Sequence, residues 1–161
     1  MDIADEKTPE ILTGNAMENF GRIDVLCSFA GIALFSTFEK TTREKYKKTM
    51  DTNLNRHFFL AQRVAKEMKK NRLPYANSSR GSIINMCSMT GVHVGEDGVV
   101  DYGITKAGLF ALTKGLATEL GPYNIRANCV SQVYILTPIQ IRDYKDVKRR
   151  DEVNKRNAIP R

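Results

Sequence analysis

The chain has 161 residues and a formal net charge of +7, with 42% hydrophobic and 27% charged residues. These values are ordinary for one globular domain. No run of 18 apolar residues occurs and the first residues are acidic, so we expect neither a membrane span nor a secretory signal. Basic residues in 142–161 alternate with acidic ones, which favours a solvated surface over a nucleic-acid site.

Helix and strand signals alternate along the first half. Thr8 and Pro9 start a predicted helix over about 9–20, and Gly21 stops it. An apolar strand is predicted at 24–28. A capping box in Thr41-Thr42-Arg43-Glu44 then opens a long helical region over about 43–70. Apolar residues recur there at steps of three and four, so one stripe is expected to be buried: Met50, Leu54, Phe58, Ala61, Ala65 and Met68.

The second half continues the alternation. A polar loop at 71–80 leads to a strand at 82–87, and a helix over about 100–120 ends at Gly121-Pro122. A third strand is predicted at 125–130. Strands that alternate with helices predict an α/β fold with a parallel sheet and right-handed crossovers.

Three cysteines, Cys27, Cys87 and Cys129, fall near the ends of the three predicted strands. Their odd number and the lack of Cys-x-x-Cys spacing argue against a disulfide framework or a metal site. We therefore expect no metal, and buried, reduced thiols in a cytoplasmic protein.

Tyr102 and Lys106 lie one helical turn apart, so their side chains share a helix face. Ser88 lies fourteen residues before Tyr102, at the end of a predicted strand. A lysine cation is expected to lower the pKa of a nearby phenol, which would then exchange a proton near neutral pH. A serine hydroxyl can bind the oxygen on which charge develops. An isolated pair at this spacing is usually an ordinary surface pair, so the surrounding sequence has to decide.

That surrounding sequence resembles the short-chain dehydrogenase/reductase family over about residues 2–138. Ile23 to Gly31 is similar to the family's strand that ends in Asn-Asn-Ala-Gly, and Asp51-Thr52-Asn53-Leu54 to its helix with a catalytic asparagine. The remaining matches are Asn85 to Gly91, Ile125 to Val130, and Thr137-Pro138. The resemblance implies a partial Rossmann-type three-layer sandwich with a parallel sheet whose first strands are missing.

Four catalytic residues are implied by the resemblance: Asn53, Ser88, Tyr102 and Lys106. Tyr102 would be the acid or base, Lys106 would stabilise the phenolate and hold cofactor ribose hydroxyls, and Ser88 would orient the substrate oxygen. Asn53 would hold a water in the proton relay. A strand-end serine that satisfies backbone groups and a solvent-facing asparagine are the structural alternatives.

The resemblance also implies an NAD or NADP cofactor. Besides Tyr102 and Lys106, the implied contacts are Asp2, Ile3, Ser28, Ala30, Gly31, Ile135 and Thr137. The glycine-rich phosphate turn of the family does not precede Ala30-Gly31, and Thr90 to Gly98 imitates it only superficially, so we interpret that stretch as a mobile loop between Ser88 and Tyr102.

Two substitutions distinguish the chain from the family pattern. Ser28-Phe29 stands where the family has two asparagines, and Gln132-Val133 where it has Pro-Gly. Both weaken the cofactor prediction and leave the catalytic residues untouched.

We expect one incomplete dinucleotide-binding domain over 1–161, with a charged, truncated substrate-lobe segment at about 139–161. The predicted activity is hydride transfer between NAD(P) and a small carbonyl or secondary alcohol, with Tyr102 as acid/base, in a homo-oligomer formed through about 43–70 and 100–120. The alternative is a truncated, cofactor-less family member that acts as an oligomerisation partner or is an inactive fragment. Neither nucleic acid nor membrane is an expected partner.

Overall fold

The computed structural model describes residues 3, 5–73, 75, 78–93, 98–133, 135, 151 and 155. The chain divides into two compact units, Met1–Ser131 and Gln132–Arg161. Most of the described residues belong to the first unit, which holds the predicted catalytic residues. The predicted charged segment at about 139–161 lies outside the described residues except for positions 151 and 155.

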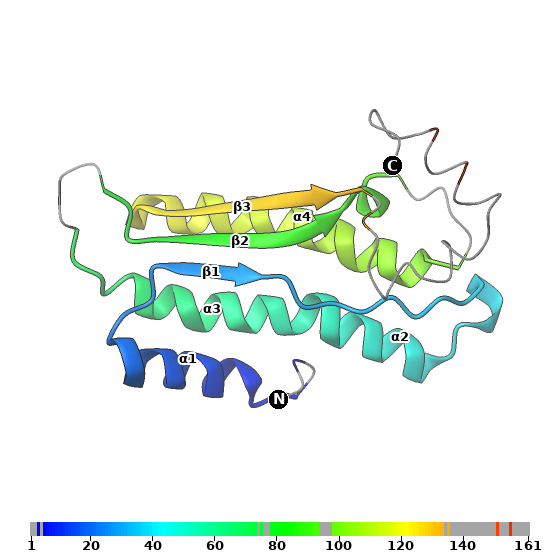
Figure 1. Ribbon diagram of the computed structural model, residues 1–161, viewed down its shortest axis with the longest axis horizontal. Helices are drawn as coiled ribbons and strands as arrows, with labels where there is room; N and C mark the ends of the chain where they lie inside the picture. Colours follow the sequence, from blue (N-terminus) through cyan, green and yellow to red (C-terminus); the bar gives the residue numbers. More distant parts are fainter. Residues whose placement is uncertain are drawn as a thin grey trace. The chain divides into compact units, whose positions relative to one another are not determined.

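Three strands form one sheet in the order β1-β2-β3: Val25–Ser28, Gly81–Ser88 and Ile125–Gln132. β1 and β2 are parallel, with Val25 opposite Ser82 and Ser28 opposite Asn85, and the three arrows point the same way in Figure 1. The predicted strands at 24–28, 82–87 and 125–130 are thereby confirmed. Their carboxyl ends share one edge of the sheet, where ligands of open α/β sheets bind.

The helices are α1 Thr8–Phe20, α2 Arg43–Met50, α3 Arg56–Met68 and α4 Val100–Leu120. α1 has a proline in its first turn and ends at Gly21, whose φ of 70° lies in the left-handed region. The long helix predicted at 43–70 is interrupted by a π-helical turn, η2 Asp51–Asn55, which closes with the Arg56 N–H on the Asp51 carbonyl oxygen. The N-cap of α2 is Thr42, which accepts from the Lys45 N–H at 3.2 Å, one residue later than the predicted capping box.

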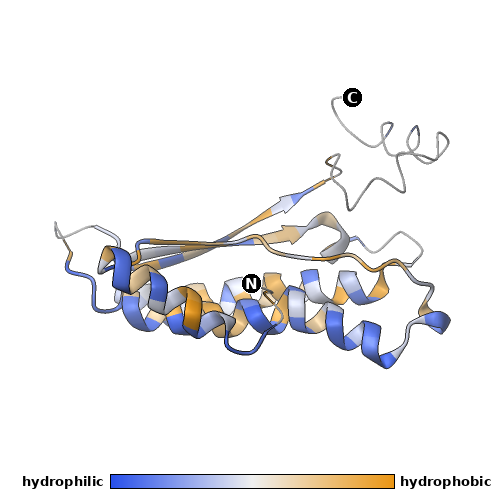
Figure 2. Ribbon diagram, turned by 60° about the horizontal axis from the view of Figure 1, so that its bottom comes forward, coloured by the Kyte–Doolittle hydropathy of each residue, from blue (hydrophilic) through white to orange (hydrophobic). Residues whose placement is uncertain are grey.

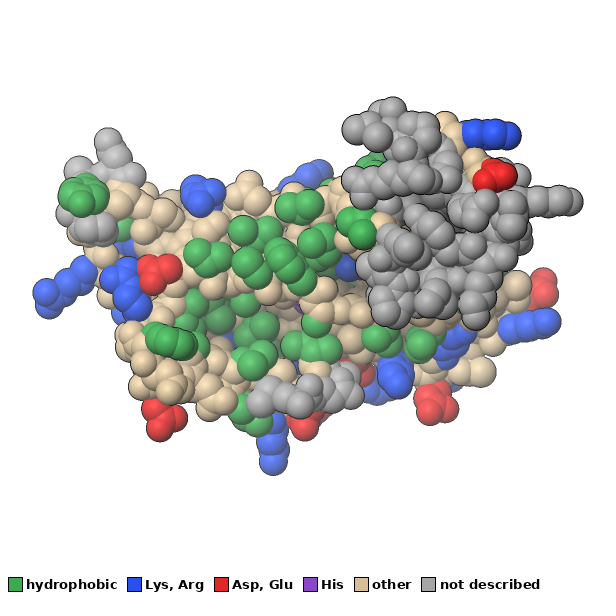
Figure 3. All heavy atoms as spheres, viewed as in Figure 1, with side chains coloured by type: hydrophobic (Ala, Val, Ile, Leu, Met, Phe, Trp, Pro, Cys, Tyr) green, Lys and Arg blue, Asp and Glu red, His purple; other side chains and the backbone are tan. Residues whose placement is uncertain are grey.

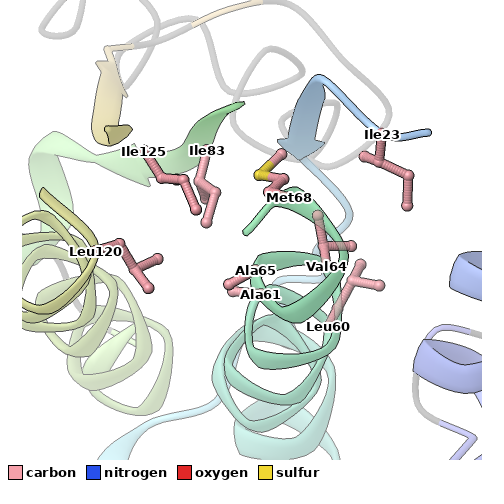
Figure 4. Close-up of a cluster of buried hydrophobic side chains, with 9 residues drawn as sticks. All are labelled: Ile23, Leu60, Ala61, Val64, Ala65, Met68, Ile83, Leu120 and Ile125. Carbon is pink, nitrogen blue, oxygen red and sulfur yellow. The ribbon is translucent and has the colours of Figure 1, made fainter. Parts of the chain in front are cut away.

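The nine-residue core lies between the helices and the sheet (Figure 4). α3 contributes Leu60, Ala61, Val64, Ala65 and Met68, which meet Ile83 on β2, Ile125 on β3, and Ile23 and Leu120. The predicted stripe was wrong at Phe58, which is 46% exposed. Because the π-turn takes one residue more than a regular turn, Phe58 does not lie in line with Met50 and Leu54.

All four α-helices lie on one face of the sheet (Figures 1 and 2). The described residues thus form two of the three layers that the resemblance implies. On the other face Val25 and Val130 are exposed, and hydrophobic side chains gather over the strands (Figure 3). Cys27 is also exposed, so the prediction of a buried thiol was wrong there, because no helix among the described residues covers its face of β1. In the same residues no helix combines the length and apolarity needed to cross a bilayer.

Three short 3₁₀ turns complete the first unit: η1 Phe38–Lys40, η3 Met89–Gly91 and η4 Gly121–Tyr123. η3 follows the carboxyl end of β2 directly and packs against α4. It therefore connects the strand that carries Ser88 to the helix that carries Tyr102.

Candidate active site

Ser88 and Tyr102 are brought together at the carboxyl end of β2. Ser88 is the last residue of the strand, and its hydroxyl lies close enough to the Tyr102 phenol, in the first turn of α4, to lower the pKa of that phenol. The Ser88 hydroxyl also accepts from the Thr90 N–H at 3.2 Å. Ser88 thus satisfies a backbone group, as the structural alternative supposed, and contacts the predicted acid/base in addition.

The pKa of the Tyr102 phenol is raised, whereas the sequence analysis expected it to be lowered. Burial is the main cause, because it disfavours the phenolate; the Cys87 thiol raises the pKa further, and the hydrogen bond with Ser88 acts in the opposite direction. The Lys106 ammonium lies 5.5 Å from the centre of the Tyr102 ring. The Lys106 ammonium is bound to another group, which explains why it does not offset the effect of burial on the pKa of Tyr102.

Lys106 is a buried cation, with 3% of its surface exposed. Its Nζ donates to the Met86 carbonyl oxygen at 2.7 Å. Burial lowers the pKa of this lysine, and the neighbouring Cys87 partly offsets the shift. A neutral carbonyl does not neutralise an ammonium, so the charged form of Lys106 can still interact with a polar ligand.

Asn53 is fully buried in the π-turn η2 and binds the loop that follows β1. Its Oδ1 accepts from the Ile32 N–H at 2.9 Å, and its Nδ2 donates to the Ile32 carbonyl oxygen at 2.8 Å and more weakly to Thr105 Oγ1 at 3.4 Å. The solvent-facing alternative is therefore excluded. The widened turn presents the amide to the loop, and π-turns are frequent at functional sites for such reasons.

Gly31, in the same loop, leaves room beside Asn53 and Lys106. A Cβ atom added to Gly31 would lie 3.4 Å from Asn53 Oδ1 and 3.8 Å from Lys106 Nζ. The space next to the buried ammonium is thus lined by backbone that a ligand can approach closely.

Sequence reasoning missed the buried imidazole of His57, which lies 2.6 Å from Ser28 Oγ through Nδ1 and 2.9 Å from the Ala30 carbonyl oxygen through Nε2. Burial lowers its pKa to about 4, and the charge of Lys106 contributes, although hydrogen bonding to the Ala30 and Thr52 carbonyl groups acts oppositely. The available signal was the serine at position 28. The hydroxyl of Ser28 is shorter than the side-chain amide of the asparagine that the family has at this position, and it needs a hydrogen-bond partner close by.

Asp101 is a second residue that the sequence analysis did not single out. Its carboxylate is buried in the first turn of α4, where it accepts from the Tyr102 N–H at 2.9 Å and from Thr49 Oγ1 of α2 at 2.9 Å. A carboxylate is favourable near a helix N-terminus. The contact holds the start of α4, and with it Tyr102, against α2.

Cys87 precedes Ser88 and is fully buried beside Cys129. Burial, together with the hydrogen bond to Cys129, raises the pKa of the Cys87 thiol to about 12. A thiol in this state is a poor nucleophile. Over the part of the chain that is described, no three His, Cys, Asp or Glu side chains gather as metal ligands.

The other predicted cofactor contacts fall differently. Asp2 and Thr137 lie outside the described residues. Ile3 is half-buried in the first unit, whereas Ile135 is exposed in the second. The hydroxyl of Ser28 faces His57, which also binds the Ala30 carbonyl oxygen, and Gly31 is the member of this group that the structure places beside Lys106 and Asn53.

A tyrosine and a lysine on one helix turn, with a serine at the end of the neighbouring parallel strand, define a class of dehydrogenases and reductases. A family model described as enoyl-(acyl carrier protein) reductase matches residues 1–161. The chain is 38% identical over 160 residues to L-rhamnose 1-dehydrogenase (NAD(P)(+)) of Azotobacter vinelandii, covering 99% of this chain and 60% of the relative. It is 37% identical over 125 residues to carbonyl reductase [NADPH] 2 of Sus scrofa, covering 78% of this chain and 48% of the relative.

Solved structures agree with the sequence relatives. A gluconate 5-dehydrogenase from Burkholderia cenocepacia, crystallised with NADP and tartrate, superposes with a TM-score of 0.88 at 26% identity, over 100% of this chain and 60% of that one. The chain belongs to the short-chain dehydrogenase/reductase family. The relatives that match nearly the whole of this chain are longer, and the chain spans about 60% of their length.

Proposed function

We propose that the protein takes part in NAD(P)-dependent hydride transfer between the nicotinamide cofactor and a small carbonyl or secondary alcohol. The observation that carries the proposal is the closeness of the Ser88 hydroxyl to the Tyr102 phenol, one helical turn from the buried side chain of Lys106. The named relatives are dehydrogenases and a reductase, and two of them carry NAD(P) or NADPH in their names. When bound, the cofactor supplies the hydride and the protein supplies the proton and the orientation.

Each residue then has a role that follows from its contacts. The Tyr102 hydroxyl donates a proton to the carbonyl oxygen in reduction and its phenolate accepts one in oxidation. The Ser88 hydroxyl holds the same oxygen. The Lys106 ammonium binds ribose hydroxyls next to Gly31, and favours the phenolate once it is drawn from Met86 toward the site.

The proposed cofactor contacts include residues of the loop after β1 and residues that only the family resemblance implies. Gly31 offers backbone beside Lys106, and Ser28 supports the loop through His57, which binds the Ala30 carbonyl oxygen. Asp2, Ile3, Ile135 and Thr137 stay predictions. The choice between NAD and NADP is left to the titration below.

The test is a titration of the purified chain with NADH and with NADPH, followed by nicotinamide fluorescence. Binding at micromolar to millimolar cofactor is expected, and absence of binding of both at millimolar concentration contradicts the proposal. If turnover is found, Tyr102→Phe should remove most of it, by about 10²–10⁴-fold, with little change in cofactor affinity. Tyr123→Phe is the control, because this exposed ring contacts Lys69 away from the site.

We propose as a second function that α3 and α4 form an oligomer interface, which would also serve a family member without cofactor. A groove of about 390 Å³ runs between these helices and is lined by Phe58, Gln62, Leu112, Gly115 and Leu116 among others. Gly115 has open space around it, so a partner helix can approach. Phe58→Glu should shift the sedimentation of the protein toward monomer. Phe20→Glu at the end of α1 alters a still more exposed ring outside the groove and should not.

A further inference from the structure

The loop after β1 is held by a buried serine–histidine pair. Ser28 ends β1 and is 5% exposed, and His57 in the first turn of α3 is 1% exposed. The imidazole lies between the Ser28 hydroxyl at 2.6 Å and the Ala30 carbonyl oxygen at 2.9 Å. One ring therefore binds the strand end and the loop two residues later.

The tautomer of His57 follows from these partners. A carbonyl oxygen can only accept, so the ring nitrogen that faces Ala30, Nε2, carries the hydrogen. In the neutral ring Nδ1 then has a lone pair, and the Ser28 hydroxyl donates to it. Both contacts are satisfied without a charge on the ring, which suits a site with the Lys106 cation nearby.

His57 acts together with Asn53, which lies four residues earlier on the same helical segment. Asn53 binds both backbone groups of Ile32, and His57 binds the carbonyl of Ala30. Gly31 lies between these two anchored residues. Its backbone has no hydrogen bond to any residue that the structure describes, so its polar groups remain available to a ligand.

We propose that Ser28 and His57 are positioning residues that fix the Ala30–Gly31 backbone for a dinucleotide, in place of the two strand-end asparagines typical of the family. The role in cofactor binding rests on the proposed function. The role in holding the loop does not, because it follows from the contacts within the free protein. Ser28 and His57 lie 29 positions apart in the sequence and contact each other through their side chains. We therefore expect that a serine at position 28 without the histidine, or a histidine at position 57 without the serine, would not hold the loop.

Nitrogen-15 NMR of the wild-type chain tests the contact without any cofactor. The chain has two histidines, and His93→Gln assigns the signals of the exposed one. We expect His57 to be neutral at pH 6 with its hydrogen on Nε2. A hydrogen on Nδ1, or an imidazolium at this pH, would overturn the proposal.

Amide hydrogen exchange tests the loop. His57→Leu removes both ring contacts, and exchange of the Ile32 amide, which Asn53 Oδ1 protects, should become at least about tenfold faster as the loop loosens, since one buried hydrogen bond is worth about that factor. His57→Gln keeps a donor for the Ala30 carbonyl and should restore most of the protection. If both variants exchange at the wild-type rate, or if glutamine fails to restore protection in a folded protein, the loop is not held by this contact.

Cofactor affinity is the last measurement. His57→Leu should raise the Kd for NADPH or NADH about tenfold and leave kcat within about threefold, because the ring touches neither Tyr102 nor Ser88, and His93→Gln should change neither value. An unchanged Kd together with a fall in kcat would contradict the positioning role. If the wild-type chain binds neither cofactor, the proposed function fails, while the NMR and exchange results still decide whether the pair holds the loop.

Discussion

Gly91 lies so close to Lys106 that a Cβ atom added to it would come within 2.7 Å of the Lys106 carbonyl carbon, and equally near the Ala107 nitrogen. Both are backbone atoms of α4 and cannot move as a flexible side chain can. Since Gly91 follows Ser88 by three residues, this contact sets the separation between the strand end and the catalytic face of α4. The absence of a side chain at position 91 is thus part of the site's geometry.

Gly91→Ala should therefore disturb the site and the fold together. Overpacking against helix backbone is expected to cost about 1–3 kcal/mol in the free energy of unfolding, and misplacement of Lys106 should lower kcat/KM by about tenfold or more. Urea unfolding and steady-state kinetics measure the two effects. Gly14→Ala in α1, where an added Cβ meets nothing within 4 Å, is the control and should be neutral or slightly stabilising. Equal behaviour of the two variants would refute the argument.

Thr49→Val should weaken the attachment of α4 to α2. The substitution keeps the shape of the side chain but removes the donor to the buried Asp101 carboxylate, and we expect a loss of about 1.5–3 kcal/mol. Thr118→Val is the matched control, because the Thr118 hydroxyl donates to the Lys114 carbonyl oxygen on the exposed face of α4. If Thr118→Val and Thr49→Val both change the free energy of unfolding by less than about 0.5 kcal/mol, the buried contact adds nothing to stability.

Stability should rise with pH between about 4 and 6.5 because of His57. Its folded-state pKa of about 4 lies below the ordinary 6.5, so the unfolded chain binds more protons in this window and the free energy of unfolding increases with pH. The difference amounts to about 3 kcal/mol, fully present above pH 6.5 and lost as the pH falls through the window.

His57→Gln should flatten this part of the profile in urea unfolding at a series of pH values. The lowered pKa of Asp51, whose ordinary value is 3.8, acts below the same window and should be unaffected. A wild-type slope that survives in the variant would assign the effect to other groups.

Cys87 should resist alkylation at pH 8 while Cys27 reacts. Cys87 is fully buried and its thiol pKa is raised to about 12, whereas Cys27 is exposed on the open face of the sheet. Mass spectrometry of peptides after iodoacetamide treatment of the folded protein separates the two, and treatment in urea should label both. Rapid labelling of Cys87 in the folded state would show that β2 is more accessible than its packing implies.

The order of strands and helices could be predicted from the sequence because each element carries its own local signal. Pro9 and Gly21 mark the ends of α1, and the run before Ser88 marks β2. The pairing of Ser88 with Tyr102 could also be expected, since both belong to a pattern of residue types in a fixed order. These features depend on neighbours in the chain or on a resemblance.

Features that depend on tertiary contacts could not be predicted. The π-turn at Asp51–Asn55 leaves no mark in a three-and-four periodicity, so Phe58 was assigned to the wrong face. The raised pKa of Tyr102 results from burial, which residue spacing does not reveal. The contact of Ser28 with His57 joins residues far apart in sequence and needed the fold to be seen.

The π-turn has a consequence for how insertions and deletions act on this protein. A widened turn absorbs one surplus residue without rotating the helix beyond it, so shortening the chain by one residue within 51–55 should restore a regular helix and leave Leu60 and Val64 in the core. The same deletion would withdraw the amide of Asn53 from Ile32. A deletion of one residue at this point should therefore remove the anchoring of the loop and leave the fold intact. Almost everywhere else in a helix, the same deletion would rotate the following residues by about 100° around the helix axis.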